Sequence, residues 1–203
     1  MKKVFKSKGF WGIIVLLLIT SITLLSVTGK KSHPENLQMA AMKKELINTE
    51  KIFDKEMEGD EGKHLSLDSL PLVNINDQAH FSFPADRYLV VRFSEINCET
   101  CVESIFSVLD ASKAIDSNRV IVLADFRSEA YLRTFVRLNT IRFPIFKYPA
   151  TNSFLHADAL GYPYLFVADK DGLAHDFFLP VKEDRERTIA YLDRIKPLFN
   201  AQK

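Results

Sequence analysis

The sequence predicts an α/β protein in which helices form a sandwich around a mixed central sheet. The first observation is alternation: from residue 87 onward, runs of bulky and β-branched residues alternate with amphipathic segments, an order typical of strands and helices that build one sheet. The second is a hairpin signal, the turn Lys170-Asp171-Gly172 between two apolar runs. In a chain of 203 residues, these elements predict one packed domain with additional N-terminal segments.

Each element has its own local signal. The strands are rich in valine, isoleucine, leucine and aromatic residues, and we expect them at 70–75, 80–83, 87–94, 118–125, 143–148, 164–169 and 173–179. The helices place apolar residues three and four positions apart, and we expect them at 99–113, 128–140 and 183–199. Ser128 is typical of a helix start, and Pro197 predicts a break near the end of the last helix.

Composition and charge exclude several classes of protein. Hydrophobic residues make up 47% of the chain and charged residues 26%, which argues against a wholly disordered chain and against a multi-span membrane protein. Six of the 27 basic residues lie within the first 31 positions, so the rest of the chain carries 21 bases and 26 acids. A mildly acidic body lacks the basic surface that nucleic-acid binding needs, so we expect no nucleic-acid partner.

The N-terminus carries a membrane signal. Residues 10–27 form an apolar run broken only by glycine, serine and threonine, with four lysines before it and two after it. The length of this run is near the lower limit for a membrane-spanning helix. The positive charge before the run predicts a cytoplasmic N-terminus. We therefore expect a cytoplasmic basic tail at 1–9, a transmembrane signal-anchor helix at 10–28, and a single-pass protein whose C-terminal domain is extracytoplasmic (periplasmic in a bacterium). The alternative is a signal peptide cleaved near residues 26–28.

Residues 29–63 are expected to form a helical linker before a folded domain at 64–203. Its helix, predicted at 35–58, lacks glycine and proline and is rich in helix formers. Two heptads are fewer than a coiled coil normally needs, so a single helix packed on the domain is favoured over a dimerising stalk. The side chains expected to contact the domain form one apolar stripe at helical spacing: Met39, Met42, Leu46, Thr49 and Phe53.

The strongest functional signal is the motif Cys98-Glu99-Thr100-Cys101, which lies between a predicted strand and a predicted helix. Cys98 is therefore expected at the helix N-terminus, where the partial positive charge and free amides stabilise a thiolate. With two residues between them, both sulfurs can share the first helical turn. One can then attack a disulfide while the other resolves the mixed disulfide. This arrangement predicts a redox-active pair in which Cys98 is the nucleophile and Cys101 the resolving thiol.

Other interpretations of the cysteine pair are weaker. A structural disulfide closing so small a loop removes little chain entropy. A zinc site needs further ligands, and the chain has only two cysteines and five scattered histidines. A thioredoxin-fold chaperone holding copper through both thiolates stays open as an alternative, as does an interaction module built on the same pair.

Two segments resemble the thioredoxin-like superfamily. The first is similar to the family's active-site strand, motif and helix, and the second to its cis-proline loop and following hairpin. The resemblance covers roughly residues 67–199. The intervening VIVLADF, a helix and then FPIF look most like the exported, membrane-anchored thiol–disulfide oxidoreductases that include those serving cytochrome c maturation. The segments read YLVVRFSEINCETCVESIF and ALGYPYLFVADKDGLAHDFFL.

The resemblance implies a thioredoxin-like sandwich and further roles in the site. Pro163 corresponds to the cis-proline that faces the cysteines, and Tyr162 would offer its backbone to the substrate chain. The implied partners are cysteine-containing exported proteins as substrates and a transmembrane thiol reductant as electron donor. No bound cofactor is implied.

The chain also departs from the family's pattern. Asn97 stands where a tryptophan often precedes the first cysteine, and Arg92 stands where many thioredoxins carry a buried acid. We expect Arg92 to point outward, because an unpaired buried arginine is costly. Glu95 occupies the position at which peroxiredoxins carry threonine or serine, three residues before their reactive cysteine. Peroxidase activity is therefore disfavoured.

Two acids near the motif bear on its chemistry. Glu99 matches a residue often found after the first cysteine in the cytochrome-maturation relatives, and Glu95 lies on the other side of Cys98. Both should oppose the helix N-terminus and hold the pKa of Cys98 higher than a histidine-containing motif would. A higher thiol pKa accompanies a more reducing pair, so we expect a reductant or isomerase-like donor rather than a strong oxidant.

Overall fold

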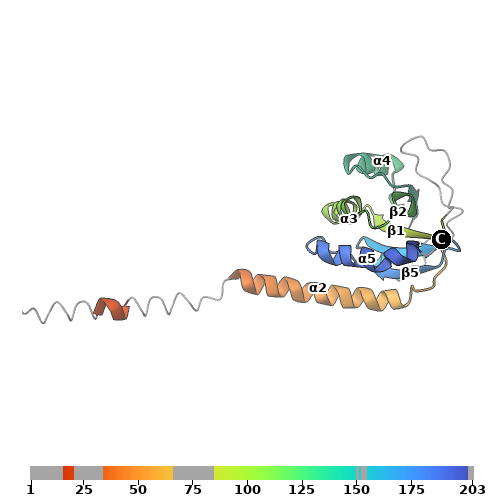
Figure 1. Ribbon diagram of the computed structural model, residues 1–203. Coiled ribbons are helices and arrows are strands. Elements are labelled where there is room, and N and C mark those ends of the chain that lie inside the picture. Colours follow the sequence, from red (N-terminus) through yellow and green to blue (C-terminus); the bar gives the residue numbers. More distant parts are fainter. Residues whose placement is uncertain (1–15, 21–33, 66–84, 150, 152–154, 201–203) are drawn as a thin grey trace, which may run out of the picture. The chain divides into compact units, whose positions relative to one another are not determined.

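Figure 1 shows the computed structural model, which describes residues 16–20, 34–65, 85–149, 151 and 155–200. The chain divides into two compact units, residues 1–49 and 50–203. Residues 16–20 are helical; the rest of the predicted anchor at 10–28 lies outside the described residues, as do the two strands predicted between 70 and 83. Within the described ranges, no helix combines the length and apolar character needed to cross a bilayer.

The second unit is built on a five-stranded mixed sheet of order β3-β2-β1-β4-β5. β1 runs parallel to β2 and antiparallel to β4, while β3 extends the sheet parallel to β2 and β5 extends it antiparallel to β4. The predicted α/β class and mixed central sheet are thus confirmed, with β1 in the middle. The strands are β1 (Arg87–Ser94), β2 (Val120–Asp125), β3 (Ile145–Lys147), β4 (Tyr164–Asp169) and β5 (Ala174–Phe178).

Both faces of β1 are buried, which explains why its sequence is a nearly continuous apolar run. Leu89, Val91 and Phe93 point into a core formed with α3 (Glu99–Ser112), α4 (Glu129–Leu138) and α5 (Arg185–Asn200). Tyr88 and Val90 point into the opposite core. Because neighbouring strand residues alternate between the faces, the two cores share one strand.

The opposite core includes the end of α2 (Pro34–Glu58). Phe53 and Met57 are 1% and 5% exposed, whereas Met39 and Met42 in the other unit are 64% and 58% exposed. Of the predicted stripe, the C-terminal residue Phe53 is therefore buried in this core, whereas Met39 and Met42 are exposed. The domain core takes in residues that the predicted boundary at 64 assigned to the linker.

Asp60 joins the end of α2 to a distant turn. Its carboxylate is fully buried and accepts hydrogen bonds from the backbone N–H groups of His156 (2.9 Å) and Ala157 (3.1 Å). These residues begin η3, a 3₁₀ helix at His156–Leu160. Lys63 donates to the same carboxylate at 2.7 Å, so the buried charge is compensated. Asp60 thus fixes the turn that carries Asp158.

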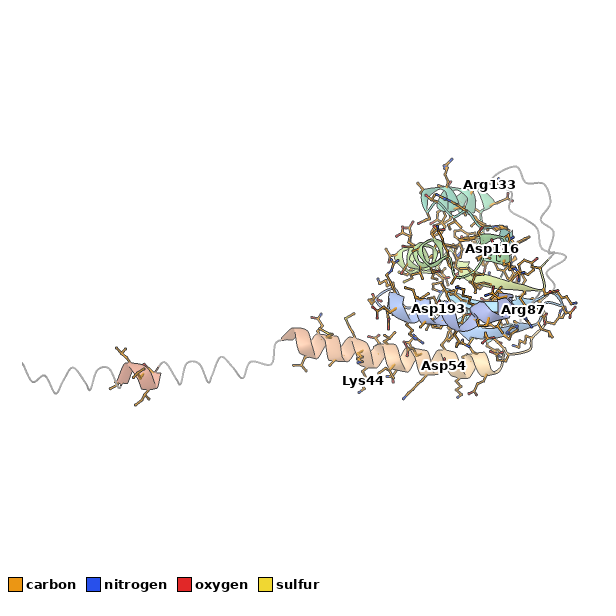
Figure 2. All side chains as sticks on the ribbon, in the orientation of Figure 1. Lys44, Asp54, Arg87, Asp116, Arg133 and Asp193 are labelled. Carbon is orange, nitrogen blue, oxygen red and sulfur yellow. The ribbon has the colours of Figure 1, made fainter. Side chains whose placement is uncertain are left out.

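The predicted break near Pro197 is wrong, because α5 continues to Asn200. Pro197 removes only one backbone donor in the last turn, where few helical bonds remain to be lost. Two arginines bind the carbonyl oxygens at this helix end. Arg87, labelled in Figure 2, donates to Leu198 O and Arg119 donates to Phe199 O, both at 2.9 Å.

Candidate active site

A tight turn links β1 to the cysteine motif. Asn97 N–H donates to Ser94 O at 3.1 Å, and Ser94 N–H donates to the Asn97 side-chain oxygen at 2.7 Å. The turn is tied to β2 because Glu95 N–H donates to Asp125 O at 2.9 Å. Ser94 and Asn97 thus satisfy each other's polar groups, which gives the turn a defined geometry.

Cys98 is the N-cap residue of α3, as the sequence predicts. Its carbonyl oxygen accepts the first helical hydrogen bonds, from the N–H groups of Cys101 (3.0 Å) and Val102 (3.1 Å). The Cys98 side chain is exposed and that of Cys101 is half-buried. No disulfide joins the two sulfurs in the structure. The exposed sulfur is therefore the one that a large partner can reach.

The environment separates the two thiols by pKa. Hydrogen bonds from Cys101 and from Thr100, whose Oγ1 lies 3.2 Å from the Cys98 sulfur, lower the pKa of Cys98. Burial raises the pKa of Cys101 to about 11, and its hydrogen bond to Cys98 adds to the rise. Stabilising one thiolate with the neighbouring thiol is what a nucleophile and a resolving partner require.

A lysine far from the motif in sequence also affects the pKa of both thiols. The positive charge of Lys182 lowers the pKa of Cys98 and of Cys101. Lys182 lies between β5 and α5 and pairs with Glu183 at 3.5 Å. Arg185 holds this segment to α3 by donating to Ser107 Oγ at 3.2 Å. No local sequence signal indicates Lys182, because it lies more than 80 positions beyond the motif.

The two acids flanking Cys98 differ in their surroundings. Glu95 pairs with Arg127 at 2.8 Å and also accepts a hydrogen bond from the Arg127 N–H at 3.1 Å, so an opposite charge faces it. Glu99 lies in the first turn of α3, directly after Cys98. Its modulation of the Cys98 pKa stays a prediction.

The Tyr162–Pro163 segment lies beside the motif. The Asn97 side-chain N–H donates to Gly161 O at 2.7 Å, which joins the residue before Cys98 to the residue before Tyr162. Tyr162 is 48% exposed and Pro163 is buried. No peptide bond in the described residues is cis, so the prediction of a cis bond at Pro163 is wrong. The trans form is the default, favoured at X–Pro bonds by about 0.5–1 kcal/mol.

Arg92 does not point outward as predicted; it is 2% exposed. Its guanidinium group forms two hydrogen bonds with the Asp158 carboxylate, at 2.9 and 3.0 Å, and donates to Tyr148 O at 2.7 Å. Burial opposes the charged form, but the bonds to Asp158 outweigh it and raise the pKa of Arg92. The prediction assumed an unpaired charge, and Asp158 supplies the missing partner.

Sequence reasoning missed Asp158 because it lies 66 positions from Arg92. Its carboxylate also accepts a hydrogen bond from the buried Tyr164 hydroxyl at 2.9 Å. The sequence signal for such a partner is Arg92 itself, because a basic residue within a largely apolar strand indicates a buried acid nearby in the fold.

The described residues contain no group of three or more histidine, cysteine or acidic side chains placed to hold a metal ion.

Comparisons with known proteins give structural matches only. No family model matches the chain, and no curated protein matches it. A thiol-disulfide isomerase from Corynebacterium glutamicum is 19% identical, covers 66% of this chain and 97% of its own, and has a TM-score of 0.42. A peroxidoxin from Mycobacterium tuberculosis is 15% identical, with coverages of 67% and 97% and a TM-score of 0.42.

A secreted disulfide oxidoreductase of Mycobacterium tuberculosis is 12% identical, covers 54% of this chain and 81% of its own, and has a TM-score of 0.40.

Proposed function

We propose that the protein is a thioredoxin-like thiol–disulfide oxidoreductase whose reacting groups are Cys98 and Cys101. One observation carries the proposal: an exposed cysteine with a lowered pKa begins a helix, and a half-buried cysteine with a pKa of about 11 lies one turn later. This asymmetry suits two successive exchange steps better than it suits two equivalent metal ligands.

The proposed reaction uses the lowered pKa of Cys98 for the first step and Cys101 for the second. The Cys98 thiolate attacks one sulfur of a partner disulfide, the partner's S–S bond breaks, and the released partner thiolate takes a proton. Cys101 then loses its proton and attacks the Cys98 sulfur. A Cys98–Cys101 disulfide forms and the second partner thiolate leaves. Two electrons pass from the dithiol to the partner, and a thiol reductant must restore the dithiol.

The proposed working direction is reduction of the partner. Glu99 beside Cys98 supports this direction. The lowered pKa of Cys98 opposes it, because a stabilised thiolate favours the dithiol over the disulfide and so makes the pair less reducing. Equilibrating the protein with glutathione measures its reduction potential and decides between the two directions of electron flow. A potential near that of thioredoxin, about −270 mV, supports a reductant, whereas one near that of a dedicated oxidant, about −120 mV, contradicts it.

Trapping tests the activity itself. The full-length Cys101→Ala variant retains Cys98 but lacks the resolving thiol, so partners should accumulate as mixed disulfides identifiable by mass spectrometry. The matched control is a Cys98→Ala/Cys101→Ala variant. No adducts, together with a Cys98 that does not react with small thiol reagents, would refute the proposal.

We further propose that residues 10–28 anchor the protein and that its substrates are exported proteins. The apolar run and the lysines before it support this topology. Membrane fractionation and protease accessibility of the domain in intact cells test it. If the domain stays protected from added protease after the outer membrane has been permeabilised, the proposed topology is wrong.

A further inference from the structure

One side chain joins the cysteine motif to the loop before β4. Asn97 directly precedes Cys98. Its amide nitrogen donates to Gly161 O at 2.7 Å, and its amide oxygen accepts from Ser94 N–H at 2.7 Å. Both partners are backbone groups, one only an acceptor and the other only a donor, so they fix which way the amide points. The half-buried Asn97 thus links the turn after β1 to residues 161–163, the 161–163 loop.

The 161–163 loop depends on such a contact for its direction. The chain before it is held by Asp158, whose carboxylate binds Arg92 at 2.9 Å, and the chain after it enters β4. Gly161, between these two fixed parts, has a φ of 71°, in the left-handed region that glycine enters at no steric cost. Because glycine also adopts many other conformations, a bond at its carbonyl oxygen restricts it. The peptide unit is planar, so the Asn97 bond also orients the backbone that leads into Tyr162.

The loop lies where a partner bonded to Cys98 extends. Tyr162 and Ile96 are 48% and 74% exposed, and both line one small cavity beside the motif. A protein partner covers far more surface than its reacting sulfur, so it contacts exposed side chains next to Cys98. A loop that is already held in one conformation needs less ordering when this contact forms.

We propose that Asn97 is a positioning residue for thiol exchange with protein partners: its amide holds the 161–163 loop so that Tyr162 contacts the chain bonded to Cys98. The inference rests on the proposed function, because the partner's sulfur must exchange with Cys98. Asn97 itself transfers no proton or electron to the sulfurs. It therefore matters for an extended chain, which reaches the loop, and not for a small disulfide, which does not reach it.

Two substrates with one leaving group separate these cases. One is an extended peptide with a single central cysteine joined to 5-thio-2-nitrobenzoate, and the other is N-acetylcysteinamide joined to the same group. In the reduced full-length Cys101→Ala variant, the Cys98 thiolate attacks the cysteine sulfur of either substrate. A disulfide with Cys98 forms, the old S–S bond breaks, and coloured thionitrobenzoate leaves as the thiolate. The ratio of the two rate constants cancels any change in the Cys98 thiolate and isolates the contacts of the longer chain.

Two substitutions of Asn97 are made in this background. Asn97→Asp retains an oxygen for Ser94 N–H but loses the donor to Gly161 O, whereas Asn97→Ala loses both groups. In both variants we expect the peptide-to-small-substrate ratio to fall about three- to tenfold, the effect that one net hydrogen bond accounts for. The carboxylate added by Asn97→Asp acts on both reactions and cancels in the ratio. The matched control is Asn139→Asp at the C-cap of α4, which loses a donor of the same kind, to Phe135 O at 3.0 Å, and should keep the parent's ratio.

A double-mutant cycle tests whether Asn97 acts through the loop. Tyr162→Ala removes the ring that the held loop presents, so Asn97→Ala should lower the ratio less in this background than in the parent. Additive effects would mean that Asn97 contacts the peptide directly, and they would overturn the positioning role.

The other outcomes separate the inference from the proposed function. An unchanged ratio in Asn97→Asp overturns the inference and leaves thiol exchange intact. Because this variant keeps the contact with Ser94, the test does not depend on whether Asn97→Ala folds. If the Cys101→Ala parent releases thionitrobenzoate from neither substrate, the proposed function and the inference are refuted together.

Discussion

Replacing Asp158 by alanine removes the carboxylate that compensates the buried charge of Arg92. Arg92 is 2% exposed, and Asp158 accepts two of its hydrogen bonds and one from Tyr164. Breaking a buried ion pair by removing one partner costs about 3–5 kcal/mol. Arg92 keeps its bond to Tyr148 O, and the Asp158 side chain is 13% exposed, so water can enter. We therefore expect the lower end, a loss of about 3 kcal/mol in the free energy of unfolding.

Urea unfolding of the reduced protein measures this loss. A domain of this size has an m-value of about 1–3 kcal/mol per molar, so the midpoint should fall by about 1–3 M. The matched control is Asp193→Ala on the exposed side of α5, for which we expect a change within about 0.5 kcal/mol. Adding Arg92→Leu to Asp158→Ala removes the orphaned charge and should recover part of the stability.

The reasoning is refuted by either of two outcomes: a loss below about 1 kcal/mol for Asp158→Ala, or a double variant less stable than that single variant. The first would mean that the buried guanidinium does not need its carboxylate. The second would mean that the loss comes from packing around Arg92 rather than from its charge.

Three other predictions concern the thiols and α2. At neutral pH, iodoacetamide should modify Cys98 and leave Cys101, whose pKa is about 11, unmodified; equal modification of both by peptide mapping would contradict the assignment. Lys182→Gln removes a charge that lowers the Cys98 pKa, so the midpoint of the pH–alkylation curve should move to higher pH, and a shift to lower pH would be inconsistent with this cause. Phe53→Ala should destabilise the domain by about 3–5 kcal/mol in urea unfolding, because Phe53 is 1% exposed in the core, whereas Met42→Ala, at a side chain 58% exposed, should have little effect.

Short-range sequence patterns predicted the bounds of the strands well where nearly the whole strand is buried. The bounds of β1 and β4 agree with the predicted strands at 87–94 and 164–169, because both strands are buried on both faces over most of their length and are rich in apolar residues. Ser128 marks the start of α4 correctly, since its side chain accepts the N–H of Tyr131. These features depend on residues close together in sequence.

The errors arise where a distant contact decides the outcome. Arg92 was predicted to point outward because an unpaired buried arginine is costly, but its partner Asp158 comes from a distant turn fixed by Asp60. Pro197 was predicted to end its helix, yet the helix continues and two arginines from other elements bind its last carbonyls. Near the motif, the sequence predicted the helix start at Cys98 correctly but could not indicate Lys182.

The side chain of Asn97 has a consequence for how this protein can change over evolutionary time. One amide group bonds Ser94 N–H with its oxygen and Gly161 O with its nitrogen, so two distant stretches of backbone depend on a single residue. A tryptophan at this position could not form both of these hydrogen bonds, because its ring carries a single N–H donor and no acceptor oxygen. Substitutions at 97 are therefore epistatic with the loop at 161, and a chimera that exchanges the cysteine motif must carry that loop with it.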